Sequence, residues 1–332
     1  MNLELKPLLS SIVNKLLSFL VDGNLKENKS KIIYCHDIAG GYLDYDTSDK
    51  KCCPTFRFWR LDLIDIFIYF SHHFISLPPK SWIKICHERN VSVYGTIIFE
   101  SLNDTFIKLF LDPDSTNKNL VRFIDKIKYI SEAMNIEGWL INVEVKPEEN
   151  TEIDLLISKI KFFLKLLSDS NLKVLWYDSL TVDGKLDWQS KLNEKNYDFY
   201  NLSNDGIYLN YTWKIGHLRD SQAMCKSDLE SSKVYVGIDC FGRGVIGDGG
   251  WNTNIALNEI VKANNTTEPH RPLSVSLFAP GWCFEKFHQI HKTIPEESLL
   301  LETMDRLSFL DWLFWYNGLA QSIHSLRGNL SR

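Results

Sequence analysis

The chain has 332 residues, of which 44% are hydrophobic and 24% charged, the ordinary balance of a globular protein. Its formal net charge of -5 argues against nucleic acid as the main partner, because binding to a phosphate backbone requires a basic face. No segment has the roughly 18 uninterrupted apolar residues of a membrane span, so no membrane partner is expected. The seven cysteines include no C-x-x-C pair, which favours a reduced, cytoplasmic setting.

The first 29 residues place leucine and isoleucine at helical spacing between polar residues. This pattern predicts an amphipathic N-terminal helix over residues 1–29 that packs on or beside the main fold. The segment lacks the basic start, long apolar run and small-residue cleavage site of a secretory signal.

Eight short apolar segments follow, separated mostly by stretches with helical periodicity. The predicted strands are residues 31–35, 64–70, 91–98, 138–144, 172–176, 206–210, 233–239 and 273–278. The predicted helices are residues 78–89, 119–135, 153–167 and 186–196, with closing helices in 295–332. Alternation of strand and helix implies parallel pairing. Eight such units predict an α/β fold, a (β/α)8 TIM barrel that makes residues 1–332 a single domain.

Polar and aromatic residues gather just past the C-terminal ends of the predicted strands. They are His36, Asp37, His72, Glu100, Asn142, Glu144, Tyr177, Asp178, Asn210, Asp239 and Trp282. In a barrel these ends meet at one rim, where the active sites of this fold lie. A doubly wound sheet would also bind ligands at strand ends, but at a single crevice.

The segment GWLINVE, residues 138–144, holds the central pair of candidate residues. Asn142 and Glu144 are two apart, so on a strand their side chains point to the same face. Burial of unpaired polar groups is costly, and one interpretation is a core pair that satisfies itself. The other is an acid beside a positioning amide, the pair needed when a substrate's own N-acetyl group attacks its glycosidic bond.

Motifs at the predicted strand ends run in a fixed order along almost the whole chain. They are HDIAGGYLDYD (36–46), DIFIYFSHH (65–73), YGTIIFE (94–100), GWLINVE (138–144), VLWYDSL (174–180), DGIYLNYTW (205–213), VYVGIDCFGRG (234–244) and LFAPGW (277–282). Together they resemble the endo-β-N-acetylglucosaminidases of glycoside hydrolase family 85. The resemblance implies retaining hydrolysis of the GlcNAc-β-1,4-GlcNAc bond in the chitobiose core of N-glycans. The 2-acetamido oxygen is then the nucleophile, and water or, in transglycosylation, a sugar alcohol opens the oxazolinium intermediate.

The resemblance also implies residue roles. Glu144 would be the general acid/base, and burial is expected to raise its pKa. Asn142 would hydrogen-bond the acetamido N–H, and Tyr177 would donate its hydroxyl to the acetamido group. Tyr177 could instead be a rim tyrosine that caps the barrel. The remaining predicted sugar-binding residues are Phe70, Phe99 and Glu100 as walls, Trp188, Trp213 and Trp282 as stacking platforms, and Asn210, Asp239 and Arg243 as partners of mannose hydroxyls.

Two tryptophans have a structural interpretation as well. Trp176 precedes Tyr177 and should point to the opposite face of its strand, into the core between sheet and helices. Trp188 could anchor its own predicted helix instead of stacking on a sugar.

Metal, phosphate and serine-hydrolase chemistry are not expected. His36, His72 and His73 lack metal-ligand spacing, and the family uses no metal, so no cofactor is predicted. The glycine-rich run 242–250 lacks the ending of a phosphate-binding loop and is predicted to be a flexible loop bordering the glycan groove. No G-x-S-x-G motif is present.

Three hypotheses about function remain. The first is an active cytosolic endoglycosidase that acts on N-glycans, glycoproteins and free oligosaccharides. The second is a catalytically inactive glycan-binding barrel. The third is another acetamido-assisted hydrolase of the chitinase type, but such enzymes typically use D-x-x-D-x-D-x-E, where an aspartate stands in place of Asn142. Larger family members carry β-sandwich modules after the barrel, and this chain is expected to lack them.

Overall fold

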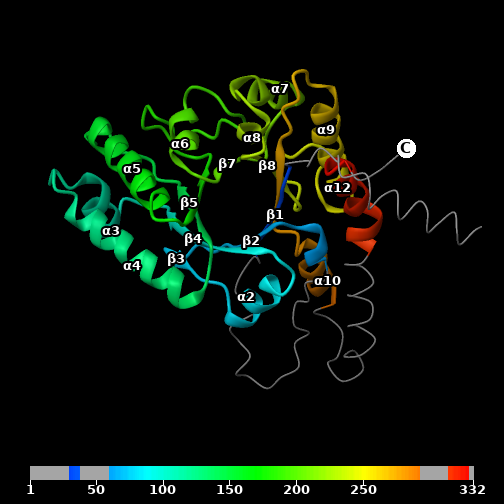
Figure 1. The fold of residues 1–332 in the computed structure, drawn as a ribbon, viewed down its shortest axis with the longest axis horizontal. Helices are drawn as coiled ribbons and strands as arrows, with labels where there is room; N and C mark the ends of the chain where they lie inside the picture. The colour runs from blue at the N-terminus through cyan, green and yellow to red at the C-terminus, as the bar shows by residue number, and fades with distance from the viewer. Residues whose placement is uncertain (1–29, 38–59, 292–312, 329–332) are drawn as a thin grey trace, which may run out of the picture.

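The computed structural model of the protein describes residues 30–37, 60–291 and 313–328 (Figure 1). Eight parallel strands close on themselves, and one short antiparallel strand is added to the outside of the circle. The parallel strands are β1 (Ile32–His36), β2 (Ile66–Tyr69), β4 (Ser92–Phe99), β5 (Gly138–Val143), β6 (Lys173–Tyr177), β7 (Gly206–Leu209), β8 (Val234–Asp239) and β9 (Ser274–Phe278). β3 (Ile75–Ser76) pairs with β4. Each predicted strand corresponds to one of the eight, so the predicted (β/α)8 barrel is confirmed.

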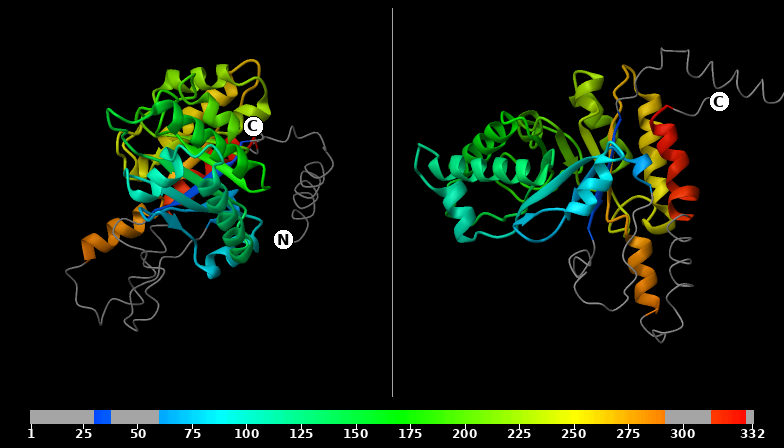
Figure 2. Two further views of the ribbon diagram at one scale, coloured as in Figure 1. Left: turned by 90° about the vertical axis from the view of Figure 1, so that its left-hand side faces the viewer. Right: turned by 60° about the horizontal axis from the view of Figure 1, so that its bottom comes forward.

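Helices form an outer layer around these strands (Figure 1). The α-helices are α2 (Lys80–His87), α3 (Asp104–Phe106), α4 (Lys118–Met134), α5 (Ile153–Ser168), α6 (Tyr197–Leu202), α7 (Ile215–Met224), α8 (Asp228–Ser231), α9 (Thr253–Thr266), α10 (Trp282–His291) and α12 (Gln321–Leu326). Short 3-10 or π turns are η2 (Leu61–Leu63), η3 (Ile107–Leu111), η4 (Gly250–Asn252) and η5 (Phe314–Ala320). α10 projects from the body of the barrel in both views of Figure 2.

The predicted helices at 78–89, 119–135 and 153–167 are confirmed as α2, α4 and α5. The helix predicted at 186–196 is wrong, because these residues form a loop that ends where α6 begins. The predicted helix at 1–29 lies outside the described residues, as does part of the closing segment 295–332. No helix in the described ranges combines the length and apolar character that crossing a membrane would need.

Alternation along the strands divides the apolar residues into two clusters. The smaller cluster fills the barrel and includes Ile33, Leu140, Leu175 and Tyr208. The larger cluster lies between the strands and the helices. Trp176 belongs to this outer layer, where its ring centroid is 4.6 Å from that of Phe199, so its predicted place in the core is confirmed.

The long helix α4 covers the sheet with a single apolar stripe. The buried residues of α4 follow a spacing of four, three and four, which places them on one face: Leu120, Ile124, Ile127 and Ser131. Ser131 accepts a hydrogen bond of 2.8 Å from the indole of Trp139 on β5, so the helix is also fixed by a polar contact.

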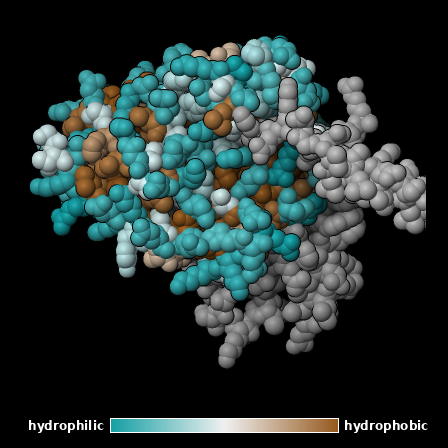
Figure 3. Space-filling view, in the orientation of Figure 1, coloured by the Kyte–Doolittle hydropathy of each residue, from teal (hydrophilic) through white to brown (hydrophobic). Residues whose placement is uncertain are grey.

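Figure 3 shows a mostly hydrophilic face on which apolar side chains gather on the left, over the region of α3, α4 and α5.

A carboxylate links the N-terminal ends of β1 and β2. Asp65, which directly precedes β2, accepts hydrogen bonds from the backbone N–H of Ile32 at 2.7 Å and from the guanidinium of Arg327 at 2.9 Å. Arg327 follows α12 and also donates to the carbonyl of Leu63 at 3.2 Å. The last described helix is therefore tied to the first two strands at the face opposite the strands' C-terminal ends.

Candidate active site

Side chains alternate between the inside and the outside of the barrel along each strand, and this alternation determines which of them point inward at the C-terminal rim. On β5 Leu140 points into the barrel, so Asn142 and Glu144 continue on the same face. The same alternation after Leu175, Tyr208 and Tyr235 brings three more predicted residues to the rim interior. They are Tyr177 on β6, Asn210 after β7 and Asp239 on β8.

Glu144 is partly exposed and receives two hydrogen bonds, one on each oxygen. Asn142 Nδ2 donates to Oε2 at 3.1 Å, and the indole Nε1 of Trp188 donates to Oε1 at 3.0 Å. Burial raises the pKa of the Glu144 carboxyl, while these two donors pull it back down. Burial outweighs the donors, so the carboxyl holds its proton more tightly than an exposed glutamate, as predicted from the sequence.

The amide of Asn142 uses its NH2 group as a donor to Glu144, while its carbonyl oxygen is not engaged by any described residue. Its side chain is only 2% exposed, and its Oδ1 has no hydrogen-bond partner within the described part of the chain. A buried acceptor without a donor costs free energy, so this atom is suited to an N–H brought by a ligand.

Tyr177 lies on the neighbouring strand and is held by Asn210. Asn210 Nδ2 donates to the Tyr177 hydroxyl oxygen at 3.0 Å, which leaves the phenolic proton for another acceptor. Burial, and next the charge of Glu144, raise the pKa of Tyr177 well above its usual value. The phenol therefore stays protonated and can act as a donor.

A second polar group lies on the same rim around Arg243. Asp239 is completely buried, and both its oxygens accept hydrogen bonds from the Arg243 guanidinium, at 2.7 and 3.0 Å. The guanidinium lies 5.7 Å from the ring centroid of Phe241 and 5.6 Å from that of Phe278. Arg243 is the member of this pair that faces solvent, whereas the predicted mannose partner Asp239 exposes no oxygen to a ligand.

His72 and Glu100 form a further pair at the rim, with His72 Nδ1 2.8 Å from Glu100 Oε1. Both side chains are exposed, and their charges are felt by Glu144: Glu100 raises its pKa and His72 lowers it. Phe70 points into the barrel, with its ring edge-on to His72 at 5.5 Å and to Phe278 at 5.4 Å.

The structure corrects two predicted sugar-binding aromatics. Phe99 is 1% exposed and packs in the outer layer against Phe74, Phe106 and Phe110, because it is out of phase with the inward-facing Ile98. Trp213 is 2% exposed, and its indole donates to the carbonyl of Gly237 at 2.7 Å. Neither side chain is placed to stack on a sugar.

Trp282 and Trp188 differ in their surroundings. Trp282 is partly buried and meets Trp251 edge-on at 5.3 Å and Phe314 at 6.1 Å, so it belongs mainly to the outer layer. Trp188 is 43% exposed and does not anchor a helix, because its segment is a loop that brings the indole to Glu144.

Sequence reasoning passed over Tyr211 and gave Asp37 no role. Burial raises the pKa of both, and each lies within the electrostatic reach of Arg243 and Asp239. The charge of Glu144 also raises the pKa of Tyr211, so both polar groups of the rim act on this phenol. Its position directly after Asn210 in the motif DGIYLNYTW was the available signal.

Metal binding finds no support in the described ranges, where no three His, Cys, Asp or Glu side chains are grouped to hold an ion. His36 points outward and packs against Trp82 at 4.7 Å under α2. His72 is engaged by Glu100.

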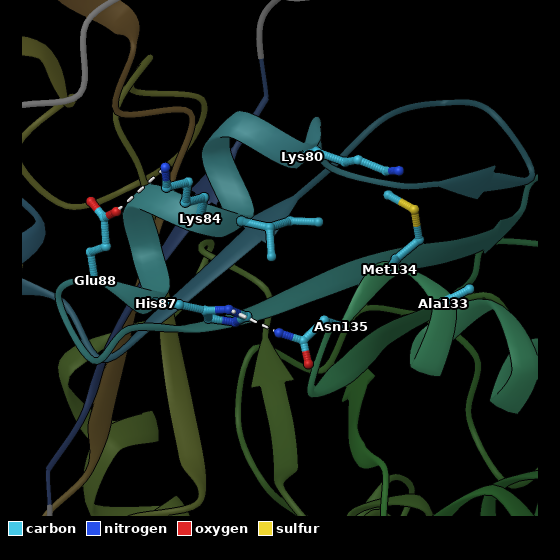
Figure 4. Close-up of a pocket in the computed structure, with 8 residues that line it drawn as sticks. Lys80, Lys84, His87, Glu88, Ala133, Met134 and Asn135 are labelled. Carbon is cyan, nitrogen blue, oxygen red and sulfur yellow. Dashed lines mark hydrogen bonds and ion pairs between the residues drawn. The ribbon is translucent and has the colours of Figure 1, made fainter.

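A cleft of about 570 Å³ lies away from this rim, between α2 and the C-terminal end of α4 (Figure 4). Lys80, Lys84 and His87 come from α2, and Met134 from α4. Lys84 pairs with Glu88 at 3.9 Å and His87 with Glu137 at 3.0 Å. Helices in this fold run back from the rim, so their C-terminal ends lie at the opposite face and the cleft is separate from Glu144.

The fold and these side chains define a (β/α)8 barrel with a polar site at its C-terminal rim. The family model for glycosyl hydrolase family 85 matches residues 42–318, and the chain belongs to glycoside hydrolase family 85. It is 36% identical over 263 residues to cytosolic endo-beta-N-acetylglucosaminidase 2 of Arabidopsis thaliana, covering 78% of this chain and 35% of the relative. It is 33% identical over 269 residues to the Homo sapiens cytosolic endo-beta-N-acetylglucosaminidase, covering 79% and 34%. The chain thus spans about a third of the length of these relatives.

Two solved structures share the barrel fold. The glycoside hydrolase domain of Endo-D from Streptococcus pneumoniae R6 aligns with a TM-score of 0.57 at 20% identity, covering 80% of this chain and 41% of that one. The endo-beta-N-acetylglucosaminidase of Cordyceps militaris aligns with a TM-score of 0.52 at 13% identity, covering 90% of each chain. At these identities the likeness concerns the fold alone.

Proposed function

We propose that the chain is an endo-β-N-acetylglucosaminidase that hydrolyses the β-1,4 bond of the chitobiose core of N-glycans with retention of configuration. The observation that carries the proposal is the Asn142–Glu144 pair on one inward face of β5, with the amide oxygen of Asn142 lacking a partner within the described chain. Family membership and the names of the relatives support the substrate: N-glycans on glycoproteins and as free oligosaccharides. Those names also support a cytosolic location.

In the first step Glu144 acts as the acid. Its carboxyl proton passes to the glycosidic oxygen, and the bond between that oxygen and C1 breaks with its electron pair going to the leaving sugar. The acetamido carbonyl oxygen of the same GlcNAc forms a bond to C1, which gives the oxazolinium ion. The raised pKa of Glu144 favours the protonated form that this step needs.

In the second step Glu144 acts as the base. Its carboxylate takes a proton from water, whose oxygen attacks C1 and breaks the bond to the acetamido oxygen. The acetamide is restored, and two inversions at C1 give retention. A sugar hydroxyl in place of water would give transglycosylation.

Asn142 and Tyr177 hold the acetamido group for attack. Asn142 Oδ1 accepts the acetamido N–H, and the Tyr177 hydroxyl donates to the acetamido oxygen. An amide performs this task beside Glu144 without adding a like charge, as a second carboxylate would. Fixing an internal nucleophile in attack geometry can lower a barrier by about 7–11 kcal/mol in well-oriented systems.

The rim residues around this centre are proposed to contact the glycan. Trp188 offers exposed aromatic surface, while Glu100 and Arg243 offer polar groups; Phe70 is 6% exposed and can offer only a ring edge. Trp282 can contribute only at the edge of its outer-layer cluster. Asn210 acts through Tyr177, to which its amide is already committed.

Incubation with a high-mannose glycopeptide, followed by mass spectrometry, tests the proposal. The expected product is the peptide bearing a single GlcNAc. A peptide that keeps both GlcNAc residues, or a bare Asn or Asp, would contradict it, and so would unaltered glycopeptide, which an inactive glycan-binding barrel would leave. The control is Glu144→Gln, which keeps the shape of the side chain but not its acid and should lose about 10²–10⁴-fold in rate. Full activity in that variant would remove Glu144 from its role.

A further inference from the structure

The loop that joins β6 to α6 carries Trp188 to Glu144 without a helix of its own. Its first part closes through an antiparallel bridge between Leu180 and Leu186. Its second part includes Ser190, whose φ of +53° lies in the left-handed region that only a few residues adopt without cost. The position of the indole therefore depends on contacts that fix this backbone.

Asp178, the residue after β6, supplies those contacts. Its side chain is only 1% exposed and accepts four N–H hydrogen bonds. One oxygen accepts from the backbone N–H of Ser190 at 2.7 Å and of Asn210 at 3.4 Å. The other accepts from Asn196 Nδ2 at 2.9 Å and from the backbone N–H of Gln189 at 3.4 Å.

These bonds act indirectly on two of the proposed catalytic residues, Glu144 and Tyr177. Gln189 and Ser190 directly follow Trp188, whose indole donates to Glu144. Asn210, on the other side, donates from its amide to the hydroxyl of Tyr177. Ser190 Oγ also lies 2.7 Å from Thr212 Oγ1, which joins the loop to the end of β7 a second time.

We propose that Asp178 is a positioning residue, whose buried carboxylate holds the 187–196 loop and the end of β7 together so that Trp188 meets Glu144 and Asn210 meets Tyr177. The inference rests on the proposed function, since it concerns the same two groups. Asp178 itself touches no substrate, because it lies beneath the loop that it holds.

A carboxylate suits this place because each of its two oxygens accepts two hydrogen bonds. An amide has a single acceptor oxygen, and its NH2 group would face two N–H donors. The four donors carry no charge, and burial raises the pKa of Asp178 to about 6 despite them. Among the titratable rim groups, Tyr177 feels this charge, because Asp178 helps to raise its pKa.

The test compares Asp178→Asn with the wild type and with Asp205→Asn. Asp205 is another buried carboxylate, 3% exposed, but it accepts from the Tyr94 hydroxyl at 2.7 Å near the strand starts, away from the rim. The readouts are kcat, KM and the alkaline limb of the pH profile with the glycopeptide. Asp178→Asn should lose ten-fold or more in kcat and shift the alkaline limb to higher pH, because a displaced Trp188 no longer lowers the pKa of Glu144. Asp205→Asn should lose thermal stability but keep the kcat and the alkaline limb of the wild type.

Combining Asp178→Asn with Trp188→Phe in a double variant distinguishes positioning of Trp188 from general destabilisation. If Asp178 acts through Trp188, the double variant should show a shift of the limb no larger than either single variant. If Asp178→Asn does not fold, Asn196→Ala, which removes one donor from the same carboxylate, should shift the limb in the same direction. An unchanged kcat and limb in a folded Asp178→Asn, or an unchanged limb in Asn196→Ala, would overturn this inference and leave the proposed function standing. A wild type without turnover would overturn both.

Discussion

At the scale of single residues, Glu144 is set between opposing effects. Burial favours the neutral acid that the first step needs, while the Asn142 and Trp188 donors favour the carboxylate that the second step needs. A group that must be acid and then base works best when neither form is strongly preferred. In the proposed mechanism the two donors would therefore serve catalysis as well as hold the side chain.

Trp188→Phe tests this balance. The change keeps an aromatic ring but removes the N–H that donates to Glu144 Oε1, so the pKa of Glu144 should rise further. Hydrolysis requires protonated Glu144, and the alkaline limb of kcat/KM should therefore move to higher pH. The other charged or titratable neighbours of Glu144, which stay in place, are Glu100, His72, Tyr177 and Tyr211. Trp251→Phe, at an exposed tryptophan of η4 that meets Trp282 edge-on, should leave the profile unmoved. A limb that moves to lower pH would contradict the assigned sign.

Asn142→Ala tests the division of work between the amide and the acid. The variant should lose about 10²-fold or more in hydrolysis of the natural glycan, because the acetamido group is no longer held for attack. It should still bind the glycan. Supplied with a preformed sugar oxazoline, it should transfer the sugar, since the step that Asn142 assists is already complete. Mass spectrometry of the products measures both reactions, and absence of transfer by a folded variant would count against the assigned role.

At the scale of elements, β5 is the strand that the site depends on, and it begins at a tightly packed glycine. A Cβ on Gly138 would lie 2.5 Å from the carbonyl oxygen of Lys173 on β6 and 3.0 Å from the ring of Tyr94. The start of β5 thus fits only a residue without a side chain, and this contact fixes the distance between β5 and β6.

Gly138→Ala should therefore destabilise the fold by about 1–3 kcal/mol, the usual cost of overpacking. The change should also reduce activity, since Asn142 and Glu144 lie on the strand that shifts. Gly216→Ala is the matched control: in α7 a Cβ there meets nothing within 4 Å, and it should stabilise by up to about 1 kcal/mol. Urea unfolding measures both, and equal stability of Gly138→Ala and the wild type would contradict the packing argument.

The elements also show which predictions a sequence can support. All eight strands were predicted because runs of β-branched and aromatic residues are intrinsic to the segments that form them. The helix at 186–196 was predicted wrongly because the carboxylate that fixes the loop, Asp178, belongs to the preceding motif, and its contacts appear only in three dimensions. Phe99 could have been excluded by its phase on the strand, whereas the burial of Trp213 depends on its bond to Gly237 in the next strand.

The pair of Asn142 and Glu144 also shows what spacing in the sequence cannot decide. Spacing placed Asn142 and Glu144 on one face, but could not choose between a self-satisfied pair and a site. The structure contains the mutual hydrogen bond of the first interpretation together with an amide oxygen that the bond leaves unused. This geometry agrees with the first interpretation and leaves the second as a proposal, because one amide can offer a donor and an acceptor to different partners.

At the scale of the whole molecule, the two ends of the barrel have different tasks. The C-terminal rim collects the carboxyls, amides and phenols of the site, several of them buried at a cost to stability. At the opposite end Asp65 links the starts of β1 and β2 to the segment after α12, through its bonds to Ile32 and Arg327. Stability and activity should therefore be separable by changes at this second end.

Arg327→Ala tests this separation. It removes the ion pair with Asp65 and the bond to the Leu63 carbonyl, while Asp65 keeps its bond to the N–H of Ile32. Because the pair is partly exposed, the loss should be about 1 kcal/mol, seen as a lower Tm with unchanged kcat per folded molecule. Lys165→Ala, which breaks a surface pair with Asp169 at 3.3 Å, is the control and should change the Tm little. A fall in kcat for Arg327→Ala at temperatures where it stays folded would show that the end of the barrel around Asp65 is coupled to the rim. That result would overturn the division of tasks between the two ends.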